Sequence, residues 1–184
     1  MPETADRPPT DSKDKPMANA QTTATRQFRT SIDIPDDKRE PLVAILNQSL
    51  ANTFDLASQT KQAHWNVKGK DFYQLHLLFD EIAGELFSYV DEIAERLTAL
   101  GGYANGTVRM ASEYSTLPEY PVKATEGGEH VAALVERFAK YAAQVRAMIA
   151  ESDDLNDPST ADLFTQISRT VDKRLWFLEA HLQK

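Results

Sequence analysis

Two polar pairs in the segment LHLLFDEIAGELFSYVDEIAER, residues 75–96, have the residue types of metal ligands. His76 and Asp80 are four residues apart, and so are Asp91 and Glu95. This spacing places the two members of each pair on one face of a helix, one turn apart. Imidazole nitrogen and carboxylate oxygen together suit Fe(II), with Zn(II), Mn(II) and Co(II) as competitors. The chain has no cysteine, which excludes thiolate ligands.

A single helix cannot bring both pairs to one metal ion. All four side chains lie on one strip about 100° wide, but Asp80 and Asp91 are about 16 Å apart along the axis. Ligand bonds to such metals are only about 2 Å long. The two pairs are, however, spaced symmetrically about the point that follows Glu85. An antiparallel copy of the helix would therefore bring the His76 pair of one chain opposite the Asp91 pair of the other, which predicts two equivalent sites between subunits.

Three neighbouring residues extend this prediction. Gly84 and Phe87 are mirrored about the same point, so a missing side chain opposite a ring would let the two helices approach closely. His64, in KQAHWNVKG, stands at the end of the preceding helix and can add a second imidazole, giving two imidazoles and three carboxylates per site. Trp65 is interpreted as a core or interface anchor; an electron donor that quenches an oxidising intermediate is the other interpretation. Each polar pair alone also fits a solvated helix surface, and only the mirrored arrangement favours a metal site.

Apolar residues at steps of three and four predict an all-α fold. Four long helices are expected, and no strand of useful length. The first begins near Pro41 and ends near Val67, and the second runs from about Phe72 to Leu100, before Gly101 and Gly102. The last two carry the apolar stripes of residues 131–149 and 163–182. A long crossover, residues 103–125, with one helical turn near RMASEY, separates the second helix from the third; this topology is that of a ferritin-like four-helix bundle.

Composition limits the class of protein. The chain has 184 residues, which suits one domain, and we expect the bundle over residues 37–184. Residues 1–36 are poor in large apolar side chains, so we expect a disordered or weakly ordered tail. No apolar run is long enough for a membrane span, and the N-terminus lacks the apolar segment of a secretory signal, which favours the cytoplasm. The net charge of −8 favours cations over nucleic acid as partners.

Acidic residues also crowd the turn SDDLNDPST and the start of the last helix. One interpretation is turn chemistry, with Ser159 or Thr160 as the helix cap; the other is the lining of a cation entry, and the sequence favours the first. The acidic residues concerned are Asp153, Asp154, Asp157 and Asp162. His130 and His181 have no carboxylate at ligand spacing and are expected on the surface, while Trp176 is assigned to packing.

The segment HWNVKGKDFYQLHLLFDEIAGELFSYVDEIAERLTALGG resembles the Dps-type miniferritins, the DNA-binding proteins of starved cells. Its spacing His-x11-His-x3-Asp-x10-Asp-x3-Glu matches the ferroxidase pattern of that family. The segment DKRLWFLEAHLQ resembles the family's C-terminal helix, TADLFTQISR resembles the segment before it, and the resemblance covers about residues 37–184.

The resemblance implies a hollow homo-dodecamer of tetrahedral symmetry with ferroxidase centres at its two-fold interfaces. It also implies oxidation of Fe(II) to Fe(III), preferably by hydrogen peroxide, and storage of ferric mineral in the cavity. The implied ligands are His64, His76 and Asp80 of one subunit and Asp91 and Glu95 of its partner. The implied candidates for an acidic three-fold pore are Asp162 and, behind it, Asp153 and Asp154.

Two other functions remain open, a nucleoid-compacting DNA-binding protein and a redox-silent shell that sequesters zinc or another divalent metal. Family members that bind DNA generally use mobile basic tails. Residues 1–30 carry five basic side chains against four acidic ones, on a chain of net charge −8. We therefore expect weak or absent DNA binding.

Overall fold

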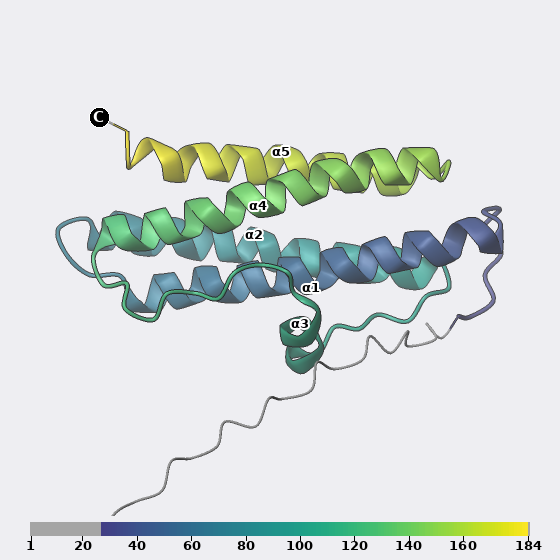
Figure 1. Cartoon of the computed structure of the whole chain (residues 1–184), viewed down its shortest axis with the longest axis horizontal. Helices are drawn as coiled ribbons and strands as arrows, with labels where there is room; N and C mark the ends of the chain where they lie inside the picture. The colour runs from purple at the N-terminus through teal and green to yellow at the C-terminus, as the bar shows by residue number, and fades with distance from the viewer. Residues whose placement is uncertain (1–26, 184) are drawn as a thin grey trace, which may run out of the picture.

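The computed structural model describes residues 27–183, and these residues form five α-helices without a strand (Figure 1). The helices are α1 (Asp36–Asn66), α2 (Phe72–Ala99), α3 (Val108–Tyr114), α4 (Gly127–Asp154) and α5 (Pro158–Ala180). Four of them are long and run side by side, whereas the short α3 lies beside α1 in the crossover between α2 and α4. The expected all-α four-helix bundle with a short extra helix in a long crossover is confirmed. None of the helices in residues 27–183 is both long and apolar enough to cross a membrane.

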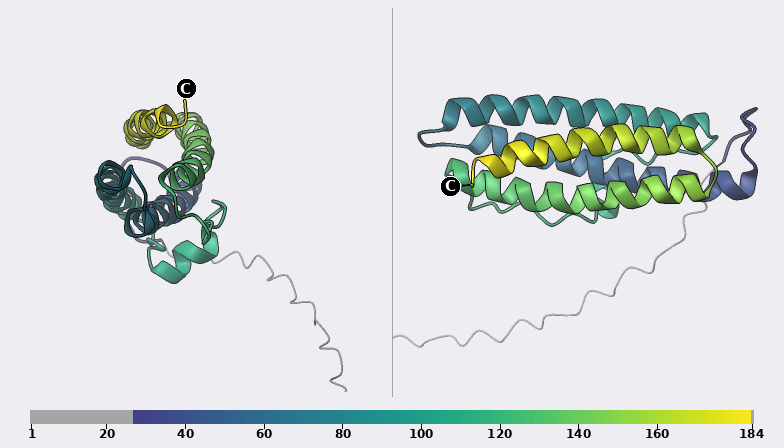
Figure 2. Two further views of the ribbon diagram at one scale, coloured as in Figure 1. Left: turned by 90° about the vertical axis from the view of Figure 1, so that its left-hand side faces the viewer. Right: turned by 90° about the horizontal axis from the view of Figure 1, so that it is seen from above.

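The helices pair according to the length of their connections. Short turns join α1 to α2 and α4 to α5, so each pair is antiparallel and packs closely (Figure 2). The crossover returns along the bundle, so that α4 begins beside the α1–α2 turn. There the Lys68 N–H donates to the Thr125 carbonyl at 3.1 Å.

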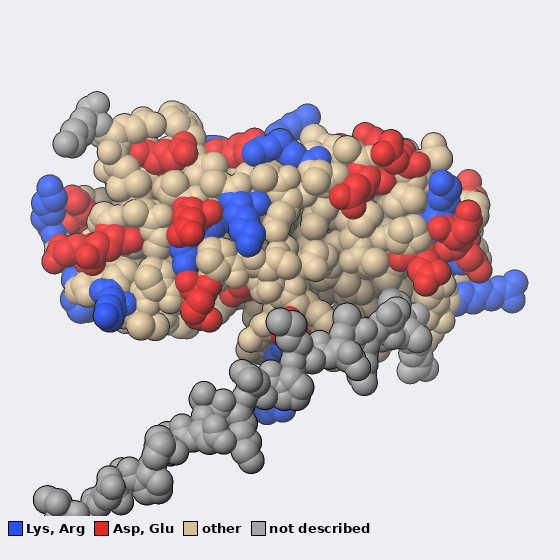
Figure 3. Space-filling view, viewed as in Figure 1, with Lys and Arg blue, Asp and Glu red and all other residues tan. Residues whose placement is uncertain are grey.

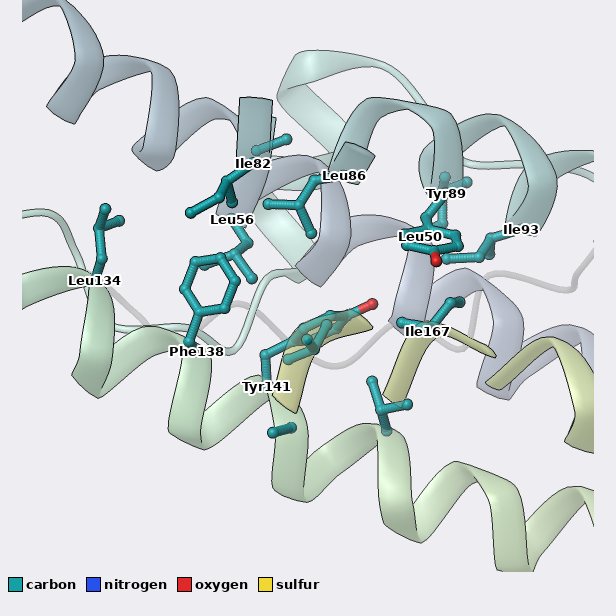
Figure 4. Close-up of a cluster of buried hydrophobic side chains, with 14 of the residues drawn as sticks. Leu50, Leu56, Ile82, Leu86, Tyr89, Ile93, Leu134, Phe138, Tyr141 and Ile167 are labelled. Carbon is teal, nitrogen blue, oxygen red and sulfur yellow. The ribbon is translucent and has the colours of Figure 1, made fainter. Parts of the chain in front are cut away.

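The core lies between the two helix pairs. Leu56 of α1, Ile82 of α2 and Phe138 of α4 are fully buried there, and Ile167 of α5 completes the contact (Figure 4). Burying such a side chain contributes about 1.5–3 kcal/mol. These residues occupy the apolar stripes of the sequence. The opposite faces of the helices are in contact with solvent, except that Arg174 of α5 also binds polar side chains of α2.

Helix α1 begins at Asp36, five residues before Pro41, so the expected start was wrong. The extra turn is held by the buried Arg39, which donates to the carbonyls of Ile34 at 3.0 Å and Leu100 at 3.1 Å. Residues 27–35 have no regular structure, and the Phe28 N–H donates to the Gly101 carbonyl. Of the expected tail, residues 1–26 lie outside the described part of the chain.

The turn between α4 and α5 is organised by Asp157, not by the expected caps Ser159 or Thr160. Asp157 is the N-cap of α5 and accepts from the Thr160 N–H at 3.1 Å and from the Thr160 hydroxyl at 2.5 Å. It also accepts two hydrogen bonds from Arg96 of α2, at 2.7 and 2.8 Å, and is 1% exposed. Burial by itself raises the pKa of Asp157, but the bonds from Thr160 and Arg96 outweigh it and hold the pKa below its usual value. Asp157 is therefore structural and does not line an entry path.

Replacing Asp157 by Asn should destabilise the chain at neutral pH and much less in acid. A partly buried Arg96 left without its carboxylate costs about 1–3 kcal/mol. Because the folded-state pKa of Asp157 is depressed, its stabilisation is present above the unfolded-state value near 3.8 and is lost as pH falls through the folded-state value. Urea unfolding at pH 7 and well below pH 3.8 checks this, with the exposed Asp162→Asn on the same helix as control. An equal loss at both pH values would contradict it.

Candidate metal centre

The centre is built where the end of α1 meets the start of α2. The turn between them reverses within residues 67–71, and Gly69, at φ +95°, supplies the left-handed backbone that the reversal needs. A Cβ on Gly69 would also lie 2.5 Å from a carboxylate oxygen of Glu126. The turn brings the rings of His64 and His76 into a stack, with centroids 3.8 Å apart and planes at 20°.

The two rings are held by a reciprocal pair of hydrogen bonds to main chain. Nδ1 of His64 donates to the His76 carbonyl at 2.7 Å, and Nδ1 of His76 donates to the His64 carbonyl at 2.9 Å. A carbonyl can only accept, so in each neutral ring the proton is on Nδ1 and the lone pair is on Nε2. Metal-binding histidines are commonly oriented in this way by a carbonyl on the other nitrogen. The donor set therefore fits a metal ion, with two imidazole lone pairs fixed in place beforehand.

Asp80 lies one turn beyond His76 and is exposed. Its carboxylate accepts from Lys61 at 2.6 Å, and the same ammonium lies 5.7 Å from the centre of the Trp65 ring. The hydrogen bond from Lys61 is the main cause that holds the pKa of Asp80 below its usual value, against a smaller opposite effect of desolvation. Charge interactions with Lys61, His64 and His76 lower this pKa further. Asp80 is therefore an ionised carboxylate beside the two imidazoles, with Lys61 as its counter-ion.

Asp91 and Glu95 lie further along α2 and are exposed. Within residues 27–183 of a single chain, no three His, Asp or Glu side chains are grouped closely enough to hold a metal ion. The structure thus brings His64 and His76 together near Asp80, and it leaves Asp91 and Glu95 apart from them. The shared site involves a second chain and stays a prediction.

The surface of α2 around the predicted two-fold axis is open and partly apolar. A Cβ built on Gly84 meets nothing within 4 Å. Phe87 is 42% exposed and contacts the edge of Phe54 at a centroid distance of 5.9 Å, and Leu77 is 49% exposed. Exposed apolar side chains gathered on one helix face are typical of a contact surface between proteins.

Several other expectations can be compared with the structure. Trp65 is exposed, as are Asp153, Asp154 and Asp162, and acidic side chains are seen at the end of the bundle where α4 passes into α5 (Figure 3). Trp176 is 60% exposed, so its expected packing is not made within the described chain.

The two remaining histidines differ from each other. His181 is exposed, as expected. The expectation for His130 was wrong, because His130 is fully buried and bonded to Tyr120. The sequence did hold a sign of this burial, since His130 precedes the core residues Leu134 and Phe138 at steps of four. Lys61 was also missed, although it lies one helical turn before His64.

Comparisons with known proteins agree with this architecture. A model of the ferritin-like domain matches residues 43–184. The "DNA protection during starvation protein" of Agrobacterium fabrum is 44% identical over 159 residues, which are 86% of this chain and 98% of that protein. DpsC from Streptomyces coelicolor has a TM-score of 0.82 at 32% identity, covering 86% of this chain and 92% of the other. The tetragonal form of Mycobacterium smegmatis Dps also has a TM-score of 0.82, at 29% identity, covering 85% and 94%.

The bundle and its crossover thus define a ferritin-like protein. Within that class, the chain belongs to the Dps-type miniferritins.

Replacing Lys61 by Met should strengthen divalent-metal binding severalfold. In the wild-type chain an arriving cation must displace the ammonium from Asp80, and an apolar side chain of similar length removes that competition. Calorimetric titration with Co(II) measures the change without any turnover. Lys70→Met, which removes another exposed lysine, is the control and should leave affinity unchanged. Weaker binding by the Lys61 variant would show that the lysine supports the site instead.

Proposed function

We propose that the chain assembles into a ferroxidase and iron-storage shell. It oxidises Fe(II), preferably with hydrogen peroxide, and stores the ferric product as mineral in the cavity of a homo-dodecamer. The observation that carries this proposal is the reciprocal bonding of His64 and His76, which leaves both Nε2 lone pairs free for a metal. Membership of the Dps-type miniferritins supports iron handling as the setting.

Fe(II) is the substrate, and its ligands come from two subunits. His64, His76 and Asp80 form one half, and Asp91 and Glu95 of the neighbouring subunit form the other. Nitrogen donors suit Fe(II), while several carboxylates stabilise the harder Fe(III) that forms. The open surface at Gly84 supports the close antiparallel contact of two α2 helices that such a site requires.

Cations would reach the cavity by electrostatic attraction. Each chain carries a net charge of −8, and acidic walls raise the local concentration of cations. Asp162 is the first candidate for the pore lining and Asp153 and Asp154 follow, because all three are exposed around the α4–α5 turn. Buried Asp157 is left out of the pore.

The protective effect follows from the reactants that are removed. Fe(II) and peroxide together generate hydroxyl radical, so a shell that consumes both reactants protects DNA without binding to it. The proposal also includes a cytoplasmic location. DNA compaction is the first alternative, because the Agrobacterium fabrum relative is named a DNA protection during starvation protein. Zinc sequestration is the second alternative, because the nitrogen and oxygen donors also suit Zn(II).

Mixing two inactive variants tests whether the site is shared. His76→Ala and Glu95→Ala should each slow oxidation at least about tenfold, since loss of even the outer partners of metal ligands costs about 10–100-fold. In a dimer of one His76→Ala chain and one Glu95→Ala chain, one site receives both substituted residues. The other site receives its histidines and its Glu95 from unsubstituted positions and is wild type. Randomly mixed shells should therefore regain about one quarter of the wild-type sites. The readout is stopped-flow absorbance after anaerobic Fe(II) loading and addition of peroxide.

The control mixes His76→Ala with Asp80→Ala, two lesions in the same half-site. Every site then carries one lesion, so mixing should restore nothing. Rescue in this control, or none in the first mixture, would exclude sites shared between subunits. Peroxide that is left unconsumed by the loaded wild-type shell would favour the zinc alternative.

DNA binding provides a separate test. The full-length chain should cause no gel shift at about 150 mM salt, because binding that rests on few uncompensated cations is screened there. The same gel at low ionic strength shows whether a weak interaction exists at all. A shift that persists at the higher salt concentration would favour the compaction alternative.

A further inference from the structure

A tyrosine and a histidine form a buried pair that the iron site described above does not use. Tyr120 lies in the crossover and is 6% exposed, and His130 lies in the first turn of α4 and is fully buried. The phenolic oxygen of Tyr120 and Nδ1 of His130 are 2.5 Å apart. Nε2 of His130 is also buried, and within the described residues it has no hydrogen-bond partner.

The pair lies next to the candidate metal centre. The His130 N–H donates to the Glu126 carbonyl at 3.2 Å, and Glu126 forms an isolated parallel β-bridge with Lys68. Lys68 lies in the turn that follows α1, four residues after His64. The Thr125 carbonyl in turn accepts from Lys68, in the turn that brings the two site histidines together. The first turn of α4, which carries His130, therefore packs against the same turn that shapes the iron half-site.

Protonation gives the hydrogen bond a direction. Burial raises the pKa of Tyr120 to about 12, against a smaller opposite effect of the neighbouring Arg137, so Tyr120 is a neutral phenol at pH 7. Burial is the main cause that lowers the pKa of His130, and the charge of Lys68 lowers it further, against opposite effects of the Asn66 and Thr125 carbonyls and of Glu129. The imidazole is therefore neutral at pH 7. Among the described residues, the one hydrogen bond of the Tyr120 hydroxyl is to Nδ1 of His130, so the phenol donates there and Nδ1 of the neutral ring accepts.

The other buried tyrosines have no such base. Tyr89 bonds to the hydroxyl of Thr170 at 2.7 Å, and Tyr141 bonds to the hydroxyl of Thr53 at 2.5 Å. A hydroxyl can share a hydrogen bond but is too weak a base to keep the phenolic proton. Among the described residues, Tyr120 is thus the tyrosine whose phenol meets an imidazole. Since oxidation of a phenol releases its proton, this is the tyrosine that can lose an electron without leaving a charged radical in the core.

We propose that Tyr120 and His130 form a redox-active pair that lends one electron to the iron site during the reduction of peroxide. The inference rests on the proposed ferroxidase function. Hydrogen peroxide needs two electrons and two protons to become two waters. When a site holds one Fe(II), that ion supplies one electron and becomes Fe(III), while Tyr120 supplies the other and solvent supplies both protons.

The pair itself is balanced by an internal proton transfer. As the electron leaves, the O–H bond of Tyr120 breaks and a bond forms between its proton and Nδ1 of His130. This leaves a neutral tyrosyl radical beside a protonated imidazole. A second Fe(II) returns the electron and becomes Fe(III), and the proton moves back to the phenolic oxygen. The net result is two Fe(II) oxidised per peroxide, with no hydroxyl radical released at a half-filled site.

Electron paramagnetic resonance on rapidly frozen samples tests the proposal. The assembled shell is loaded with one Fe(II) per site and mixed with peroxide. The wild type and Tyr141→Phe, the matched control with an equally short bond to a hydroxyl, should show a tyrosyl radical. Tyr120→Phe and His130→Gln should lose it. Tyr120→Phe removes only one oxygen and keeps the ring beside Arg137, so it carries the test even if His130→Gln fails to assemble.

A second arm omits iron and oxidises the shell with a photoexcited ruthenium complex and persulfate. A radical that depends on Tyr120 and His130 in both arms supports the pair. Two outcomes overturn the proposal and leave the ferroxidase function intact, provided that Fe(II) oxidation is normal. One is a tyrosyl signal that is unchanged in Tyr120→Phe, and the other is a radical located on Trp65. A Tyr120 radical under light without any Fe(II) oxidation supports the pair and overturns the ferroxidase function.

Discussion

The reciprocal bonding between His64 and His76 is the constraint on which the centre depends. Each hydrogen bond joins the side chain of one helix to the main chain of the other, so the register of α1 against α2 and the tautomer of both rings are set together. A change of register by one residue would break both bonds at once. The same two contacts therefore stabilise the antiparallel pairing and prepare the lone pairs for a metal ion.

The remaining bundle keeps α2 fixed along its length. Near the middle, the buried Arg174 of α5 binds Glu81 at 2.6 Å and Glu85 at 2.5 Å, on the flank of the strip that carries the predicted ligands. Near its end, Arg96 is held by Asp157, one residue after Glu95. Three anchored points on one helix explain how side chains spread over several turns keep a common direction. The rigidity of α2 is thus a product of both helix pairs.

Local pattern predicted the helices and most of the half-site, because the period of the apolar residues and the spacing of His64, His76 and Asp80 are properties of neighbouring residues. Features that depend on distant partners were missed. Arg39 extends α1 through a carbonyl 61 residues away, and Lys61 reaches Asp80 across a turn. His130 lacks ligand spacing and so was assigned to the surface, although a phenol from the crossover accounts for its burial. The spacing of Asp91 and Glu95 is visible in the sequence, but their partner is another molecule.

Gly84 separates the requirements for folding of one subunit from those for association of two subunits. Because a Cβ there would meet nothing within 4 Å in the same molecule, a substitution should meet no steric obstacle in the folding of one subunit. The added side chain would weaken only the association of two α2 helices. It would do so twice in each dimer, because both copies of the residue lie at the axis. A single codon can therefore tune how readily newly made subunits associate while the bundle itself is unchanged.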